Sequence, residues 1–204
     1  MSNEEQTVEP QRKRTQLIII FGLAIAATFI PYLMYFTGIG IPTGTVNNGR
    51  LIAEPVSLAD ANIRTSEGEL LKLAEPPFKF RMIFLVNGEC DSQCRDLLFL
   101  TRQVHTRLSD KGDQFERLYI DLSAQSSKSL EDFLKEEHPK LRYARSDLSE
   151  WQDLLSSTSE ISQPFTGHEY FLTHRYGALS MVYDDVQTGN ELLKDLKFLV
   201  RTSN

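Results

Sequence analysis

The chain has little cysteine and no excess of basic residues. Its 204 residues include two cysteines, Cys90 and Cys94, so neither has any other cysteine in the chain to pair with. Lys and Arg number 22 against 28 Asp and Glu, which gives a formal net charge of −6. Without a basic stripe to neutralise phosphates, the composition argues against a nucleic-acid partner. Internal repeats and low-complexity tracts are also missing, and about 140 residues remain for one domain.

One long apolar run interrupts this ordinary composition. Residues 17–36 carry no charge, and about 20 helical residues span a bilayer core of about 30 Å. Arg12, Lys13 and Arg14 precede the run, and the next basic residue is Arg50. The positive-inside rule then predicts a single-pass inner-membrane protein with a cytoplasmic N-terminus and a periplasmic soluble domain. We interpret the run as an uncleaved anchor, because it is longer than a signal-peptide core and a cleavage site is poorly matched.

The chain therefore divides into four predicted parts. They are a cytoplasmic tail (1–16), a transmembrane anchor (17–36), a linker (37–60) and a thioredoxin-like domain (61–204). The linker is rich in Gly, Pro, Thr and Asn, and we expect a short hairpin around residues 50–54. A periplasmic domain meets oxidising chemistry, so a disulfide between Cys90 and Cys94 is permitted there.

Hydrophobic patterns predict alternating strands and helices after the linker. Apolar or alternating runs predict strands at 80–86, 115–122, 169–173 and 178–183, the last two forming a hairpin whose turn ends at Gly177. Helical periodicity predicts helices at 91–109, 126–137, 147–156 and 192–200, whereas 141–144 is ambiguous. This order predicts an α/β, thioredoxin-like mixed sheet with helices on both faces. The cysteines fall at its first strand-to-helix junction.

The two cysteines have three possible roles. One turn apart on a helix, Cys90 and Cys94 have Cα atoms about 6 Å apart, within the range of a disulfide. The helix N-terminus stabilises a thiolate, while Glu89 and Asp91 oppose that effect. The pair suits thiol–disulfide exchange, and two thiolates with one imidazole also suit Cu(I). The third role is a structural staple, although closing so short a loop stabilises a fold only modestly.

Four histidines could complete a copper site. His168 is the best candidate for the third ligand, because the loop before its strand packs beside the dithiol in a thioredoxin-like domain. We expect His105 to lie too far along its helix, His138 to be a solvent-exposed helix cap, and His174 to point away at the hairpin tip. The predicted metal ligands are therefore Cys90, Cys94 and His168.

Residues 80–200 resemble the SCO/SenC family of membrane-anchored, thioredoxin-like copper proteins. The resemblance rests on the C-x-x-x-C stretch 90–94, the strand end 118–121 and the hairpin 170–177, although Arg95 stands where the family has a proline. Residues 48–51, 101–105 and 193–197 are similar to short anchored proteins encoded beside cytochrome oxidase assembly genes in proteobacteria. The resemblance implies two cysteines and one histidine as copper ligands, and a role in assembling the copper centre of cytochrome c oxidase.

The residues and the resemblance together lead to one main functional hypothesis. It is a membrane-anchored factor that assists cytochrome c oxidase assembly through copper delivery, thiol–disulfide exchange at Cys90 and Cys94, or both. Its expected partners are an oxidase subunit or other assembly factors. The alternative is a non-catalytic, membrane-tethered interaction module with a structural disulfide. A peroxide-reducing thiol enzyme is disfavoured by the acidic neighbours of Cys90 and by the lack of a nearby activating Thr or Arg pattern.

Overall fold

The computed structural model describes residues 8–37 and 47–202, except 126, 157, 159–160 and 162–164. The chain separates into two compact units, residues 1–45 and residues 46–204, and each is described by itself. Residues 1–7 of the predicted tail and 38–46 of the predicted linker lie outside the described residues.

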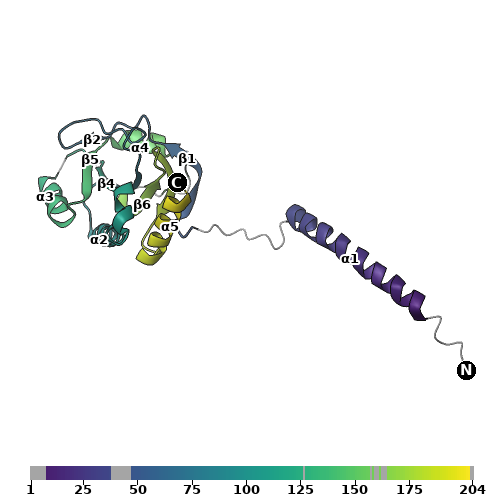
Figure 1. Cartoon of the computed structure of the whole chain (residues 1–204). Coiled ribbons are helices and arrows are strands. Elements are labelled where there is room, and N and C mark those ends of the chain that lie inside the picture. Colours follow the sequence, from purple (N-terminus) through teal and green to yellow (C-terminus); the bar gives the residue numbers. More distant parts are fainter. Residues whose placement is uncertain are drawn as a thin grey trace, which may run out of the picture. The chain divides into compact units, whose positions relative to one another are not determined.

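The first unit contains one long apolar helix, α1 (Val8–Thr37) (Figure 1). Its stretch Arg14–Thr37 has a mean hydropathy of 2.4 over its most apolar window, and none of that window is buried in protein. The 24 residues of this stretch, at ~1.5 Å each, exceed the thickness of a bilayer core. Such a helix near an N-terminus is a membrane anchor or a signal sequence, and it contains the predicted span 17–36.

The second unit is built on one mixed sheet. Among the described residues the sheet has seven strands in the order β1-β7-β6-β3-β4-β5-β2. The strands are β1 (Arg50–Ser57), β2 (Arg64–Thr65), β3 (Phe80–Val86), β4 (Phe115–Asp121), β5 (Leu141–Arg145), β6 (Thr166–Thr173) and β7 (Ala178–Tyr183). Strands β3, β4 and β5 run parallel, whereas the other neighbouring pairs are antiparallel. All seven residues of β3 are buried, as its nearly continuous apolar character predicts for a central strand.

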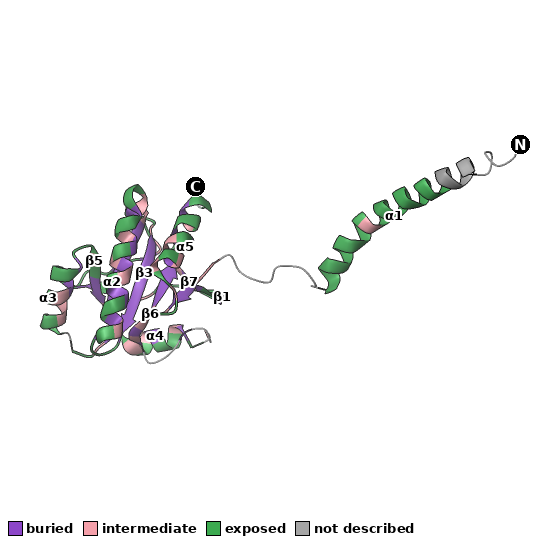
Figure 2. Ribbon diagram, turned by 90° about the horizontal axis from the view of Figure 1, so that it is seen from below, coloured by how far each residue is buried: buried purple, intermediate pink, exposed green. Residues whose placement is uncertain are grey.

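The helices of the domain cover both faces of the sheet, which confirms the predicted architecture (Figure 2). They are α2 (Ser92–Arg107), the 3₁₀ helix η1 (Ser109–Gln114), α3 (Lys128–Glu137), α4 (Leu148–Leu154) and α5 (Gly189–Thr202). One face packs on α2, α3 and α5 through a core that includes Leu97, Leu134 and Leu196. The other face packs on α4 through a core that includes Trp151.

Side-chain caps fix where three of these helices begin. Asp91 accepts a hydrogen bond from the N–H of Cys94, Ser127 from that of Leu130, and Asp147 from that of Ser149. Each satisfies a backbone donor that the first turn would otherwise leave unpaired. The cap at Asp91 is also the element that sets the position of the cysteines.

Three local expectations differ from the structure. The hairpin expected at 50–54 is wrong, because β1 instead pairs antiparallel with β7, so that part of the predicted linker is an edge strand of the domain. The ambiguous stretch at 141–144 is a strand, β5, paired parallel with β4. Strand β6 begins at Thr166 rather than at residue 169, which places His168 inside the strand. All three differences arise from pairing between strands that are distant in the sequence, which local sequence patterns do not predict.

Candidate redox site

Cys90 and Cys94 form a disulfide at the N-terminus of α2. Their Cα atoms are 5.3 Å apart, close to the separation expected for residues one helical turn apart. Strand β3 ends at Val86, and a loop containing Gly88 leads to Cys90. The N–H of Cys94 donates to Asp91 Oδ1 at 3.0 Å, so the same carboxylate caps the helix and holds the second cysteine. The predicted strand–dithiol–helix junction is therefore present.

The two sulfur-bearing residues differ in their access to solvent. Cys94 is fully buried and Cys90 is 4% exposed, so both lie largely inside the domain. A Cβ built on Gly167 at the start of β6 would lie 2.8 Å from Cys94 Sγ, which shows how closely this backbone covers the inner sulfur. Gly88, by contrast, faces open space. Of the two cysteines, Cys90 is therefore the one that retains some exposed surface.

His168 lies next to the helix N-terminus that carries the cysteines. It is the third residue of β6, in the stretch between Thr166 and Tyr170 where the register with β3 shifts. Its Nε2 lies 2.8 Å from Asp91 Oδ2. The structure thus connects His168 to the dithiol through Asp91.

The Asp91 carboxylate contacts both the second cysteine and His168. One carboxylate oxygen accepts from the N–H of Cys94 and the other contacts the ring of His168. The Cys94 N–H, followed by His168, lowers the pKa of the Asp91 carboxyl below its ordinary value of 3.8. Asp91 is therefore ionised at neutral pH, and it places a negative charge beside the disulfide.

The described residues do not include a preassembled metal centre. Within these ranges, there is no group of three or more His, Cys, Asp or Glu side chains arranged to hold a metal ion. The two sulfurs are bonded to each other, and the His168 ring is paired with Asp91. A donor set of Cys90, Cys94 and His168 would require reduction of the disulfide and rotation of the ring away from Asp91.

The other histidines serve local structure. His105 Nε2 lies 3.0 Å from the carbonyl of Gly112, at the end of α2 remote from the cysteines. His174 lies at the β6–β7 turn and packs edge-on against Phe80, the first residue of β3, whereas the cysteines follow the end of β3. His138 is the C-cap of α3, but the expectation that it is solvent-exposed is wrong. It is 3% exposed, and burial lowers its pKa to about 4.

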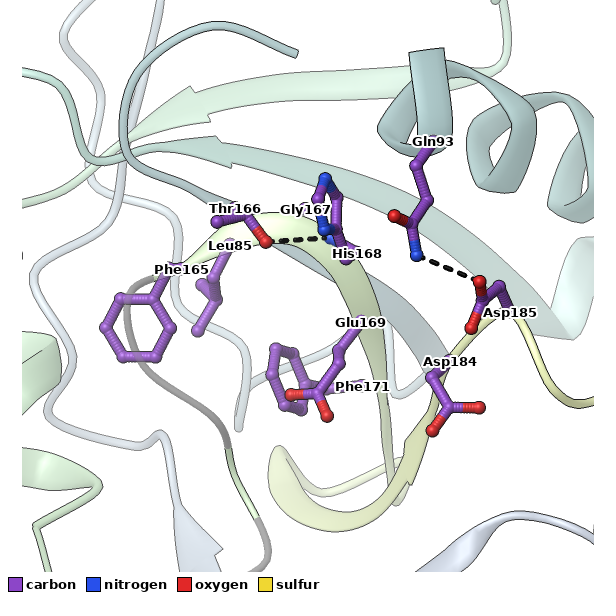
Figure 3. Close-up of a pocket in the computed structure, with 10 residues that line it drawn as sticks. All are labelled: Leu85, Gln93, Phe165, Thr166, Gly167, His168, Glu169, Phe171, Asp184 and Asp185. Carbon is purple, nitrogen blue, oxygen red and sulfur yellow. Dashed lines mark hydrogen bonds between the residues drawn. The ribbon is translucent and has the colours of Figure 1, made fainter. Parts of the chain in front are cut away.

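A pocket that includes His168 opens between β6, the end of β7 and the first turn of α2. It has a volume of about 330 Å³, and Figure 3 shows the side chains that line it. Glu169, Asp184 and Asp185 give it an acidic rim, and Arg50 pairs with Glu169 and, at 3.8 Å, with Asp184. Gln93, inside the C-x-x-x-C stretch, donates to Asp185.

The sequence analysis missed both this pocket and the role of Gly167. A glycine at the start of a strand is a recognisable signal for close backbone approach. The acidic rim has no such signal, because its members come from separate strands that only the folded sheet brings together.

Several solved structures of Sco proteins have the same fold. Yeast Sco1 with copper bound aligns with a TM-score of 0.55 and 15% identity, over 78% of this chain and 95% of that one. Bradyrhizobium japonicum ScoI with copper bound aligns with a TM-score of 0.51 and 18% identity, over 72% and 99%. BsSco, a Sco family member described with a disulfide switch, aligns with a TM-score of 0.53 and 13% identity, over 76% and 96%. At these identities the likeness establishes a Sco-like, thioredoxin-like fold.

The sequence itself matches one family model. No curated protein matches the chain. The model described as transmembrane-like, thioredoxin-like, C-terminal domain matches residues 81–203, which is more than half of the chain and includes both cysteines, His168 and every helix from α2 to α5. With its C-x-x-x-C disulfide at the first strand-to-helix junction of a Sco-like fold, the chain belongs to the transmembrane-like, thioredoxin-like C-terminal domain family.

Proposed function

We propose that this protein is a membrane-anchored thiol–disulfide exchange factor that acts on the copper-ligand cysteines of a cytochrome c oxidase subunit. The observation that carries the proposal is the Cys90–Cys94 disulfide at the N-terminus of α2, in which Cys90 is 4% exposed and Cys94 is fully buried. The copper-bound and disulfide-switching Sco structures of the same fold support the choice of client.

The exchange runs in two displacement steps. In the reduced protein, the thiolate of Cys90 attacks a client disulfide, forms a mixed disulfide and releases one client thiolate. The thiolate of Cys94 then attacks Cys90 Sγ, closes the Cys90–Cys94 disulfide and releases the second client thiolate. Two electrons pass to the client, which leaves with both cysteines reduced and ready to bind copper.

The local electrostatics tune this chemistry in two opposing ways. The N-terminus of α2 carries partial positive charge, which stabilises the thiolate of Cys94 before it attacks the mixed disulfide. The ionised Asp91 beside it works against that stabilisation. We therefore expect a moderately reducing dithiol rather than a strong oxidant.

Trapping the mixed disulfide tests the proposal. Cys94→Ser in the full-length protein leaves Cys90 free to attack but unable to resolve, so it accumulates a covalent complex with the oxidised copper-binding domain of the oxidase subunit. Cys90→Ser is the matched control, and it traps no complex because Cys94 is fully buried. Equal trapping by both variants, or none by either, contradicts the assigned roles.

The reduction potential separates exchange from a structural staple. A non-catalytic, tethered module with a structural disulfide is the alternative function, and structural disulfides have potentials below about −300 mV. We expect a potential above that range, measured by equilibrating the full chain against glutathione and dithiothreitol couples. A lower value favours the alternative.

Copper delivery is the second candidate function. Once reduced, Cys90 and Cys94 offer two soft sulfur ligands, and His168 lies beside the same helix N-terminus. Cu(I) would then be cargo held by these three residues. Titration of the reduced protein with Cu(I) tests this, and both Cys90→Ser and Cys94→Ser should abolish tight binding while His168→Gln weakens it. Wild-type affinity in the cysteine variants rules the role out.

The apolar helix α1 is the basis for the proposed cellular location of the protein. We propose that it remains in the inner membrane, with the N-terminus in the cytoplasm and residues 46–204 in the periplasm, because Arg12, Lys13 and Arg14 precede it. A retained anchor keeps the domain with membrane extracts after alkaline washing, whereas a cleaved signal sequence releases it.

A further inference from the structure

The outer face of α5 combines cations with an exposed aromatic side chain. Lys194, Lys197, Phe198 and Arg201 are exposed there, beside the half-buried Leu193, and these five residues are called the α5 face. They line a shallow hollow of about 410 Å³. Phe198 is 45% exposed, so a large ring that could have joined the core is left in solvent.

The α5 face is not needed to hold the helix on the domain. Leu192, Leu196 and Val200 on the opposite side are buried in the core, and they account for the attachment of α5 to the sheet. Among the described residues, neither Lys197 nor Arg201 forms an ion pair with an acidic side chain. Lys194, Lys197 and Arg201 therefore form a cationic patch on a chain whose net charge is −6.

Cations around an exposed ring suit the surface of an anionic bilayer. The ring enters the boundary between headgroups and acyl chains, while Lys and Arg extend their charged ends to the phosphates. Each cation near such a surface contributes on the order of 1 kcal/mol. An acidic protein would satisfy the charges but would leave Phe198 without an apolar slot.

The segment that follows the anchor is fastened to α5. Asp195 is 3% exposed, and its carboxylate accepts hydrogen bonds from the backbone N–H groups of Asn48 and Gly49, the side chain of Asn48 and the hydroxyl of Tyr183. The side chain of Asn48 also donates to the carbonyl of Glu191. The chain thus enters the domain on α5 itself.

The covalent connection limits how far Asn48 can lie from the end of the apolar helix. Helix α1 ends at Thr37, and ten residues, 38–47, separate it from the fastened Asn48. Ten residues span at most about 35 Å when fully extended. On the proposed function, in which α1 is a retained anchor, this length keeps Asn48, and the helix to which it is bonded, within reach of the bilayer.

We propose that the α5 face docks on the anionic headgroups of the membrane that holds the anchor. The docked domain then presents its redox site toward the membrane surface, because Tyr183, which bonds to Asp195, ends β7 at the same end of the sheet at which β3 leads to the cysteines. The docked domain can then react with substrate cysteines that lie near the bilayer surface.

Depth-dependent quenching in nanodiscs tests the docking. The full-length chain carries a bimane label at Thr202→Cys, at the exposed end of α5, or at Glu75→Cys, near a second exposed aromatic pair, Phe78 and Tyr176. The native cysteines are joined and buried, so only the new thiol reacts. We expect brominated phosphatidylglycerol to quench the label at 202 and not the label at 75.

Charge reversal with a matched control completes the test. Lys194→Glu, Lys197→Glu and Arg201→Glu together should lower the docked-to-undocked ratio by more than the roughly 100-fold that loss of the three cations alone would give. Lys128→Glu, Lys135→Glu and Lys140→Glu make the same change in net charge on another exposed region and should leave the quenching unchanged.

Three outcomes overturn the docking. They are quenching at 75 but not at 202, equal quenching in discs of phosphatidylcholine alone, and no quenching in discs that have incorporated the chain. The last result leaves the anchor and the exchange function intact. Failure of the chain to enter discs at all contradicts the anchor itself, and the docking that rests on it.

Discussion

Replacing Gly167 by alanine tests how tightly β6 packs on the inner sulfur. The added Cβ would lie 2.8 Å from Cys94 Sγ and 2.9 Å from Val86 Cγ2. Both distances are shorter than a carbon tolerates, and both neighbours are fixed, one in a disulfide and the other in the central strand. Gly167 also has a φ of 79°, a left-handed conformation that alanine adopts at a cost of about 1–2 kcal/mol.

The expected loss of stability has two separable parts. Overpacking in a fixed core costs about 1–3 kcal/mol, and the left-handed backbone adds its own strain, so Gly167→Ala should lower the unfolding free energy by about 2–5 kcal/mol. Gly68→Ala is the matched control, because Gly68 has a φ of 85° and open space around its Cβ position. Gly68→Ala therefore has the backbone strain of a left-handed alanine but no steric clash at its Cβ.

Urea unfolding of the oxidised full-length protein in detergent provides the measurement. Trp151 is the only tryptophan in the sequence and is fully buried, so its fluorescence follows loss of the core. Repeating Gly167→Ala in a Cys90→Ala, Cys94→Ala background removes the sulfur and should recover part of the loss. The reasoning is refuted if Gly167→Ala costs no more than Gly68→Ala, or if removing the sulfur recovers nothing.

Three further predictions follow from buried and bridging groups. Asp195→Ala leaves the donors of Asn48 without their acceptor, so we expect a loss of about 2–4 kcal/mol and faster amide exchange at residues 48–49 by mass spectrometry, whereas unchanged exchange would contradict the fastening. Burial lowers the pKa of His138 to about 4 from 6.5, so the unfolded chain binds the proton first as the pH falls. Stability should therefore drop by at most about 3 kcal/mol between pH 6.5 and pH 4, and His138→Gln should remove this slope in urea titrations; a slope that persists would assign it elsewhere. The pKa of Asp91 is lowered by the Cys94 N–H and by His168, so its stabilisation is present above its ordinary pKa of 3.8 and is lost as the pH falls through its lower folded value. Asp91→Asn should flatten the curve in that acid window, and a curve that stays as steep would show that other carboxyls carry it.

Local patterns were sufficient where chemistry and neighbours in the chain agree. The apolar run 80–86 predicted β3 to the residue, and the helix predicted from residue 91 begins at Ser92 with Asp91 as its N-cap. One helical turn between Cys90 and Cys94 allowed the disulfide that the structure contains. The apolar run at 17–36 likewise lies within a continuous helix.

Contacts between distant segments decided the rest. Strand β1 pairs with β7 instead of folding into a hairpin, because Asp195, nearly 150 positions away, accepts hydrogen bonds from the residues just before it. His138 looked like an exposed cap and proved buried, since exposure depends on what the sheet places over the helix end. His168 is paired with Asp91, and Gly167 rests on Cys94, because β6 lies beside β3 in the sheet. The sequence determines which chemical groups a short segment contains, whereas only the tertiary fold determines which groups from distant segments come into contact.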